Sequence, residues 1–303
     1  MRLLPRSACL LLCVGVTLVS GPLSFAQAIP ELDSPLEPQE VFLKMIQANT
    51  NLAYSGSLAF ERAGQLATYR VENQVKVSGN QSLEPLNRAL PIQTHSLLCA
   101  EQGASGPDLE NLSNLYNFYR PGDTVVAGRA AIELLMLPVD ANRYGYALSV
   151  DAENYLPLRT VVLTPQRAPL ERYEFVNIEF FDVPNPEAPP ECADSEEQPA
   201  HWLASRLPDG FYIGSSVYET ETDISQLVVT DSLATVSISI EPVASPKFPP
   251  VTTQLGATNI LLSYLSFQQQ IYLATLVGEV PLESLELIAR GLIPNQGLNQ
   301  STN

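Results

Sequence analysis

The sequence predicts an α+β protein built mainly from antiparallel strands, and three features of its 303 residues support this class. Strand-like runs follow one another through short turns, which is typical of an antiparallel meander forming a broad curved sheet. A helical period of apolar residues is clear in only two segments, 37–49 and 281–290. An acidic, proline-rich stretch at 183–199 separates two strand-rich parts, so we expect domains at 29–182 and 200–294, joined by a linker.

The first 28 residues predict export from the cytoplasm. Arg2 and Arg6 precede an apolar run at 8–19, and Ala26-Gln27-Ala28 then has the A-x-A pattern of a signal-peptide cleavage site. The run is about a dozen residues long, whereas a spanning helix needs about 20. We therefore expect a mature chain that begins near Ile29 and works outside the cytoplasm, with a membrane anchor as the alternative.

The charge of the chain restricts its partners. The formal net charge is −17, and removing the two arginines of the signal peptide gives −17 − 2 = −19 for the mature chain. Such a surface repels the phosphate groups of nucleic acids, so nucleic acid is excluded as a partner. It also disfavours adsorption to anionic lipid head groups.

Two cysteines remain in the mature chain, Cys99 and Cys192. An even number of cysteines in an oxidising compartment predicts a disulfide. In the chain-entropy model a loop of 192 − 99 = 93 residues is stabilised by about 4–5 kcal/mol. Two separate buried thiols are the alternative.

The first domain is predicted to begin with one amphipathic helix. Pro38 suits its first turn, and Val41, Phe42, Met45 and Ile46 fall on one face. Strands follow, beginning with a hairpin around Ala63-Gly64. The predicted strands are 54–62, 65–77, 92–101, 115–119, 129–137, 143–150, 155–164 and 170–181.

The second domain is predicted to contain five strands and a closing helix. The helix starts at Pro281, with Leu282, Leu285, Ile288 and Ala289 on one face. The polar tail at 295–303 is expected to be disordered. The predicted strands are 211–219, 226–230, 234–240, 260–267 and 272–277.

No residue pattern indicates catalysis or a metal site. His95 and His201 have no Cys, His or Asp at the spacing of metal ligands. The G-x-S-x-G, P-loop, G-x-G-x-x-G and H-E-x-x-H motifs are absent. We interpret the chain as non-catalytic and free of cofactors, with an unrecognised secreted hydrolase as the alternative.

Basic residues are few, yet four fall in strands of the first predicted sheet: Arg129, Arg143, Arg159 and Arg172. One interpretation is that they form cross-strand ion pairs with Glu133, Glu171 and Glu174. The other interpretation is a local basic and aromatic site beside Arg143-Tyr144-Gly145-Tyr146.

Val126-Ala-Gly-Arg129 and Arg143-Tyr-Gly-Tyr146 are the most specific local motifs of the chain. The residues of these and similar motifs are Tyr54, Gly56, Gly128, Arg129, Tyr144, Gly145, Tyr146, Trp202, Gly256 and Asn259. In these residues the chain resembles the RseB/MucB family of periplasmic regulators of the envelope-stress sigma factor, and it is expected to be located in the periplasm. The resemblance covers nearly the whole mature chain in order, except around 79–112 and the linker.

The resemblance implies a large domain shaped as an unclosed β-barrel on a helix, similar to the carriers LolA and LolB, and a smaller C-terminal α+β domain. The C-terminal domain would bind the periplasmic segment of a single-span anti-sigma factor and shield it from the site-1 protease. Binding of lipopolysaccharide or lipoprotein would release the protein from the anti-sigma factor. A lipid or lipoprotein carrier is the alternative function. Both a monomer and a homo-oligomer are compatible with the sequence.

A three-turn helix is too small to cover eight strands, so we expect a partly open apolar cavity on the inner face of the first sheet. Such a cavity would accept acyl chains, with Arg129 and Arg143 at its rim. Ordinary packed core is the alternative. The expected lining is Leu58, Phe60, Leu134, Met136, Tyr144, Tyr146 and Val161.

Overall fold

The computed structural model describes residues 36–73, 81–87, 109–181 and 198–295. The predicted signal peptide, the strand at 92–101, His95, both cysteines of the mature chain, nearly all of the linker and the tail from 296 lie outside these residues. Among the described helices, none has both the length and the apolar character needed to cross a bilayer.

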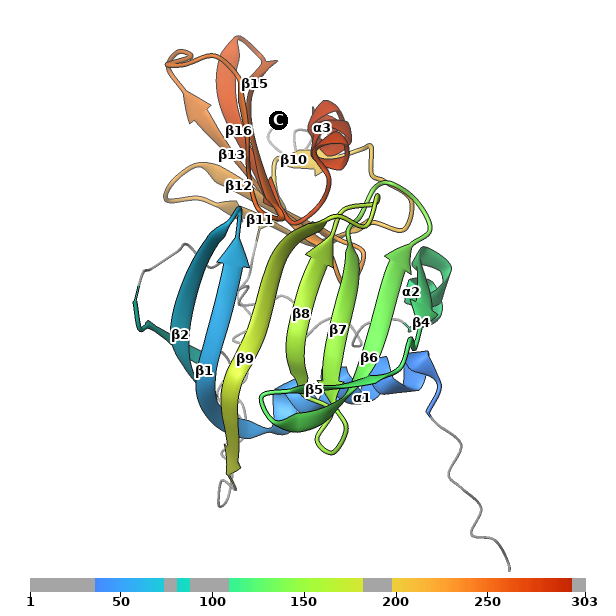
Figure 1. The fold of residues 1–303 in the computed structure, drawn as a ribbon. Coiled ribbons are helices and arrows are strands. Elements are labelled where there is room, and N and C mark those ends of the chain that lie inside the picture. Colours follow the sequence, from blue (N-terminus) through green and yellow to red (C-terminus); the bar gives the residue numbers. More distant parts are fainter. Residues whose placement is uncertain (1–35, 74–80, 88–108, 182–197, 296–303) are drawn as a thin grey trace, which may run out of the picture. The chain divides into compact units, whose positions relative to one another are not determined.

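The first part of the chain forms one antiparallel nine-stranded sheet (Figure 1). The strand order is β3-β2-β1-β9-β8-β7-β6-β4, with β5 also paired to β6. Among the described strands, the edge strands β3 and β4 do not pair with each other, so the sheet is unclosed, as predicted. Its strands are β1 (Ala53–Arg62), β2 (Gln65–Asn73), β3 (Gln81–Pro85), β4 (Tyr116–Tyr119), β5 (Asp123–Val126), β6 (Arg129–Pro138), β7 (Gly145–Asp151), β8 (Pro157–Leu163) and β9 (Pro169–Phe181).

The β1–β2 hairpin turns at the predicted position. Ala63 and Gly64 both have positive φ, 49° and 72°. Two such residues form the turn whose twist matches that of paired strands. Register then follows directly, with Arg62 opposite Gln65 and Leu58 opposite Tyr69.

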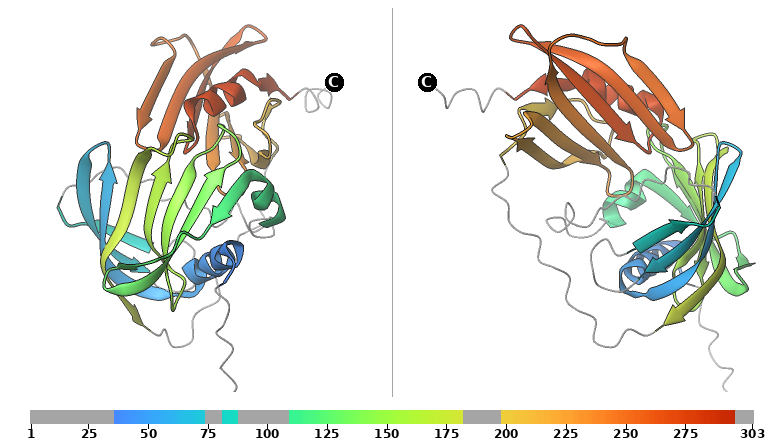
Figure 2. Two further views of the ribbon diagram at one scale, coloured as in Figure 1. Left: turned by 45° about the vertical axis from the view of Figure 1, so that its right-hand side comes forward. Right: turned by 90° about the vertical axis from the view of Figure 1, so that its left-hand side faces the viewer.

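The helix α1 (Pro38–Asn51) packs against one face of this sheet, and α2 (Leu109–Leu115) precedes β4 (Figures 1 and 2). Val41 and Phe42 of α1 are buried in a cluster with Leu134 and Leu148 of the sheet. The predicted helix is confirmed, and its apolar stripe is the one expected from the sequence. We call the sheet face that α1 covers the inner face.

The second part of the chain forms an antiparallel six-stranded sheet in the order β11-β12-β13-β16-β15-β14. A helix, α3 (Leu282–Arg290), packs on one face through Leu285 and Ile288. A two-stranded sheet of β10 (Trp202–Ala204) and β17 (Leu292–Pro294) completes this part. The six strands are β11 (Tyr212–Glu219), β12 (Ile224–Thr230), β13 (Thr235–Val243), β14 (Val251–Leu255), β15 (Thr258–Phe267) and β16 (Gln270–Gly278).

Candidate functional site

Five of the seven predicted cavity residues share the inner face of the first sheet: Leu58, Phe60, Leu134, Met136 and Tyr146. Cross-strand partners lie on the same face of a sheet. Met136 is opposite Tyr146, and Leu134 is opposite Leu148 of the core under α1. Phe60, Leu134 and Met136 are almost completely buried in packed clusters, whereas Leu58 and Tyr146 keep partial exposure.

Val161 belongs to the opposite face, so its placement in the cavity lining is wrong. It is opposite Ala147 and Arg172, while its neighbour Val162 is opposite Tyr146. A strand reverses its side chains at every residue, and an error of one position therefore changes the face.

Arg143 is fully buried and cannot form an exposed rim, so this expectation is also wrong. Its Nη1 donates to Asp231 Oδ2 at 2.7 Å, and its Nη2 donates to Asp140 Oδ2 at 3.1 Å. Nη2 also donates to the carbonyl oxygen of Asp209. The guanidinium lies over the ring of Phe211, 5.1 Å from its centre. Arg143 thus joins the end of the first sheet to residues that flank β11 and β12.

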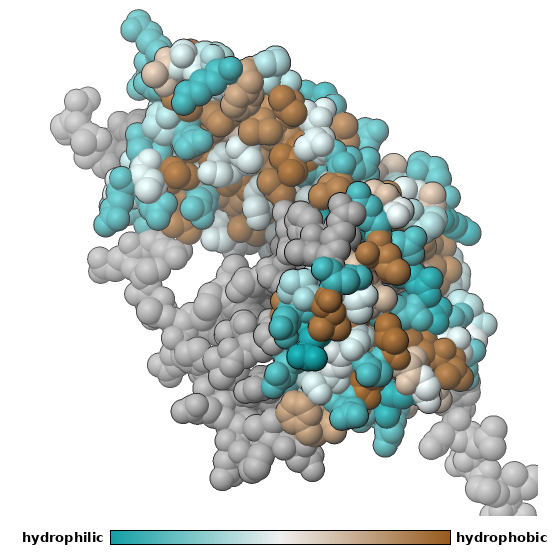
Figure 3. All heavy atoms as spheres, turned by 60° about the vertical axis from the view of Figure 1, so that its left-hand side comes forward, coloured by the Kyte–Doolittle hydropathy of each residue, from teal (hydrophilic) through white to brown (hydrophobic). Residues whose placement is uncertain are grey.

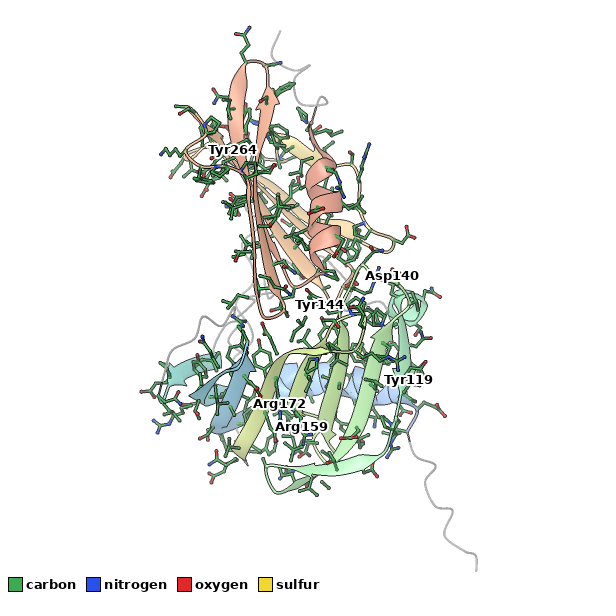
Figure 4. The ribbon with its side chains drawn as sticks, turned by 45° about the horizontal axis from the view of Figure 1, so that its top comes forward. Tyr119, Asp140, Tyr144, Arg159, Arg172 and Tyr264 are labelled. Atoms are coloured by element: carbon green, nitrogen blue, oxygen red, sulfur yellow. The ribbon has the colours of Figure 1, made fainter. Side chains whose placement is uncertain are left out.

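Tyr144 is part of the same junction rather than of a cavity lining. Its hydroxyl accepts a hydrogen bond from the Asn259 side-chain amide at 3.0 Å, and that amide also donates to the carbonyl of Val280. Burial raises the pKa of the Tyr144 hydroxyl to about 12, so it stays neutral. Figure 4 labels Tyr144 and Asp140, which flank Arg143 after β6.

A second buried ion pair lies nearby on β9. Glu171 Oε1 is 2.7 Å from Arg62 Nε and also accepts the backbone N–H of Ala257 at 2.7 Å. Gly256 has φ +61°, and a Cβ there would lie 2.1 Å from the Glu171 carboxylate. Only glycine therefore fits between Glu171 and the β14–β15 turn, which explains one motif residue.

Arg129 lies far from Arg143. It begins β6, a strand of ten residues that spans about 30 Å, and Arg143 follows its other end. The guanidinium binds Asp151 through two nitrogens and Glu153 at 3.0 Å, and lies over Phe180. The two arginines therefore do not form one rim.

Three further motif residues, Tyr54, Gly56 and Trp202, have packing roles, and Gly128 supplies the positive φ of the turn before β6. Tyr54 contacts the Phe175 ring edge to face, with 5.8 Å between ring centres, and Trp202 packs likewise on Tyr272. At Gly56 a Cβ would lie 2.4 Å from the carbonyl oxygen of Asn177. Outside the motifs, His201 stacks on Tyr218 at 3.7 Å.

A groove of about 440 Å³ opens on the opposite side of the first sheet from α1, beside the β1–β2 hairpin, and is lined in part by Arg159, Val161 and Arg172. Figure 4 shows the two arginines on β8 and β9. Both bind Glu174, at 3.3 Å in the case of Arg159, and Glu61 also lines the groove. Arg159 and Glu174 form one of the cross-strand pairs that the sequence offered as one interpretation, whereas Arg172 and Glu174 lie on the same strand.

Sequence reasoning missed Asp231 as the partner of Arg143, and it named Glu171 only as a partner of the arginines in the first predicted sheet, not of Arg62. Asp231 and Glu171 are both buried, and they lie 88 and 109 residues from Arg143 and Arg62 along the chain. Asp231 stands in a segment that resembled the family, which was the one available signal. Among the described residues, no group of three or more His, Cys, Asp or Glu side chains is arranged to hold a metal ion.

Two family models match the chain consecutively. The MucB/RseB N-terminal domain model matches residues 72–199, and the MucB/RseB C-terminal domain model matches residues 196–293. The chain belongs to the MucB/RseB family. The point where the models meet lies at the end of the predicted linker, between the two large sheets.

Members of this family from other bacteria are similar to this chain over most of its length. The sigma factor AlgU regulatory protein MucB of Pseudomonas aeruginosa is 28% identical over 282 residues, which is 83% of this chain and 89% of the relative. The sigma-E factor regulatory protein RseB of Haemophilus influenzae is 24% identical over 221 residues, 68% of this chain and 69% of that protein.

Solved structures extend the similarity to the fold. A crystal structure of MucB in complex with MucA(peri) has a TM-score of 0.65 at 26% identity, covering 86% of this chain and 99% of that one. A crystal structure of MucB has a TM-score of 0.61 at 25% identity, covering 85% of this chain and 98% of that one.

Proposed function

We propose that this MucB/RseB protein is a periplasmic, non-enzymatic regulator. It binds the periplasmic segment of a membrane anti-sigma factor, shields that segment from the site-1 protease and so restrains the envelope-stress sigma factor. The observation that carries the proposal is the match of both family models together with the similarity to MucB solved with MucA(peri). A carrier of lipids would require only the first sheet, whereas here the second part of the chain matches its own family model.

The test is a reconstituted cleavage reaction. Mature protein, residues 29–303, is added to the periplasmic segment of the anti-sigma factor from the same genome and to the site-1 protease. We expect saturable binding and a cleavage rate that falls as binding saturates, while protein alone leaves the segment intact. An unrelated protein of similar net charge is the control for non-specific effects. An unchanged cleavage rate at saturating protein would reject the proposal.

The release by lipid is a second proposal, located on the inner face of the first sheet. Leu58 and Tyr146 keep partial exposure there. Tyr146 packs against the same cluster as the half-buried Met45 and Ile46 of α1, and Leu58 packs against the cluster that contains Phe175. These side chains are placed to contact an acyl chain, whereas Leu134 is 1% exposed and belongs to the packed core.

Bulky substitutions separate these two roles. Leu134→Trp should lose about 1–3 kcal/mol of stability through overpacking. Leu58→Trp should keep its melting temperature and weaken the effect of lipopolysaccharide on the cleavage reaction. A lipid response that is unchanged in Leu58→Trp would exclude this part of the inner face as the acyl site.

A further inference from the structure

A side chain from the second part of the chain completes the apolar core of the first. The turn at 231–234 joins β12 to β13, and its half-buried Leu233 packs against the cluster of apolar residues under α1. Gly210 lies against the same cluster, because a Cβ there would be 2.5 Å from the side chain of Leu115. One end of this inner core is therefore closed by residues of the second part.

A buried hydroxyl group without a partner belongs to this cluster. Tyr116 of β4 is 1% exposed, and its hydroxyl has no hydrogen-bond partner among the described residues. Burial raises the pKa of this hydroxyl, which therefore keeps its proton and remains a donor. Buried hydroxyl groups are nearly always hydrogen-bonded, so an unpaired one calls for an explanation. The Tyr116 hydroxyl can donate to an acceptor that a ligand brings.

Tyr116 and Leu233 lie at the same end of the inner core. The centre of the Tyr116 ring is 5.8 Å from the Arg143 guanidinium, and Arg143 binds Asp231, two residues before Leu233. The ring of the half-buried Tyr146 lies 6.4 Å from that of Tyr116. This end of the core therefore combines an apolar cluster, one unpaired donor and a half-buried leucine on a turn.

The outer surface of the first sheet is less suited to a long apolar chain. On the side drawn in Figure 3, hydrophobic residues of this sheet lie among hydrophilic ones. The groove beside the β1–β2 hairpin is lined in part by Glu61, Arg159 and Arg172, which an alkyl chain would shield from water without offering them a hydrogen bond. A ligand with an alkyl chain and a single acceptor matches the inner core instead.

We infer that the end of the inner core beside Tyr116, Tyr146 and Leu233 is a binding site for one acyl chain in ester linkage. The alkyl chain takes the place of the Leu233 side chain, and the ester carbonyl accepts a hydrogen bond from the Tyr116 hydroxyl. The inference rests on the proposed release by lipid and places the ligand at the Tyr146 end of the inner face. Because Leu233 and Asp231 share one turn, occupancy also draws the Asp231 carboxylate away from Arg143.

The experiment compares two neutral ligands of similar length, methyl laurate and tetradecane, by their displacement of the fluorescent probe N-phenyl-1-naphthylamine from the mature protein. Tyr116→Phe removes only the hydroxyl and should keep its melting temperature. We expect it to weaken binding of methyl laurate about fivefold, the equivalent of one hydrogen bond, and to leave tetradecane within about twofold of wild type. The control is Tyr119→Phe, at a residue of the same strand that is 49% exposed and on the opposite face. It should change the binding of neither ligand.

Shortening Leu233 tests the displacement. Leu233→Ala should bind both ligands about fivefold more tightly because the competing side chain is smaller, whereas Leu265→Ala, in the core under α3, should bind them like wild type. Absence of ligand binding to wild type, an equal loss of both ligands in Tyr116→Phe, or unchanged binding in either Tyr116→Phe or Leu233→Ala would overturn the inference. The cleavage reaction without lipid contains none of these ligands, so its outcome tests the proposed function separately.

Discussion

Replacing Arg143 by methionine should destabilise the protein strongly, since it removes the cation from a buried ion pair. Asp231 is completely buried, and its Oδ2 would lose the 2.7 Å bond from Arg143. Its Oδ1 would keep the backbone N–H groups of Leu233 and Ala234, which offset only part of the desolvation. Removing one partner of a buried pair costs about 3–5 kcal/mol.

That free energy corresponds to a fall in melting temperature of about 6–20 °C, at about 2–4 °C per kcal/mol for a protein of this size. Differential scanning calorimetry of the mature protein measures it. The control is Arg120→Met, which breaks the partly exposed Arg120–Asp123 pair and should cost about 0–1 kcal/mol. Equal, small shifts in both variants would refute the reasoning.

Two further measurements distinguish a lost charge from lost packing. The double variant Arg143→Met, Asp231→Asn should be more stable than Arg143→Met alone, since no buried charge is left unpaired. Burial already raises the pKa of Asp231 above its ordinary value, and loss of Arg143 would raise it further. A carboxyl with a raised folded-state pKa loses its stabilising contribution as pH rises. The stability deficit of Arg143→Met should therefore grow as pH rises above the ordinary carboxyl pKa of about 4.

Three other predictions concern the junction, the turn at Arg129 and the cysteines. Gly256→Ala should lower the melting temperature by several degrees, because the added Cβ clashes with the buried Glu171 carboxylate and φ is positive. An unchanged melting temperature in calorimetry would contradict this. Burial opposes ionisation of Asp151, but hydrogen bonds from Arg129 and from backbone N–H groups lower its pKa below 3.8. The Asp151 carboxylate therefore stabilises the fold above that pH, and this stabilisation is lost as pH falls through the folded-state pKa. The stability gap between wild type and Arg129→Met should accordingly narrow in acid titrations below about pH 4. Cys99 and Cys192 should be bridged in exported protein, and non-reducing mass spectrometry that finds both thiols free would reject the bridge.

The sequence predicted secondary structure well where the residues of one short segment are enough to determine it. The helix at 37–49, the closing helix and the Ala63-Gly64 turn follow from a proline, an apolar stripe and a pair of turn residues, and all three are present. Short strands were missed, including β5 and β14. Each has four or five residues, too few for alternation to show, and β14 buries none of them.

The candidate site was harder to predict because it depends on distant pairs. Arg143 was expected at a rim on account of its charge, yet its partner Asp231 lies 88 residues away. Nothing local to either residue indicates that both are buried. Val161 was assigned to the wrong face of the sheet by an error of one residue. Bulges of β8 against β7 and β9 shift the register there, and no sequence pattern predicts them.

The contacts between the first sheet and the second part of the chain differ in kind from the cores on either side. Each large sheet buries its own apolar cluster against its own helix, α1 or α3. Between them, Arg143, Glu171 and Asn259 supply charged and polar bonds, and the apolar cluster there has only three buried members, Tyr144, Val162 and Ala257. Charged groups regain hydration when they separate, whereas exposing apolar surface to water costs free energy in proportion to its area. Their directional bonds therefore fix the arrangement of the two parts, and a junction that loses Arg143 leaves the buried Asp231 carboxylate without its cation.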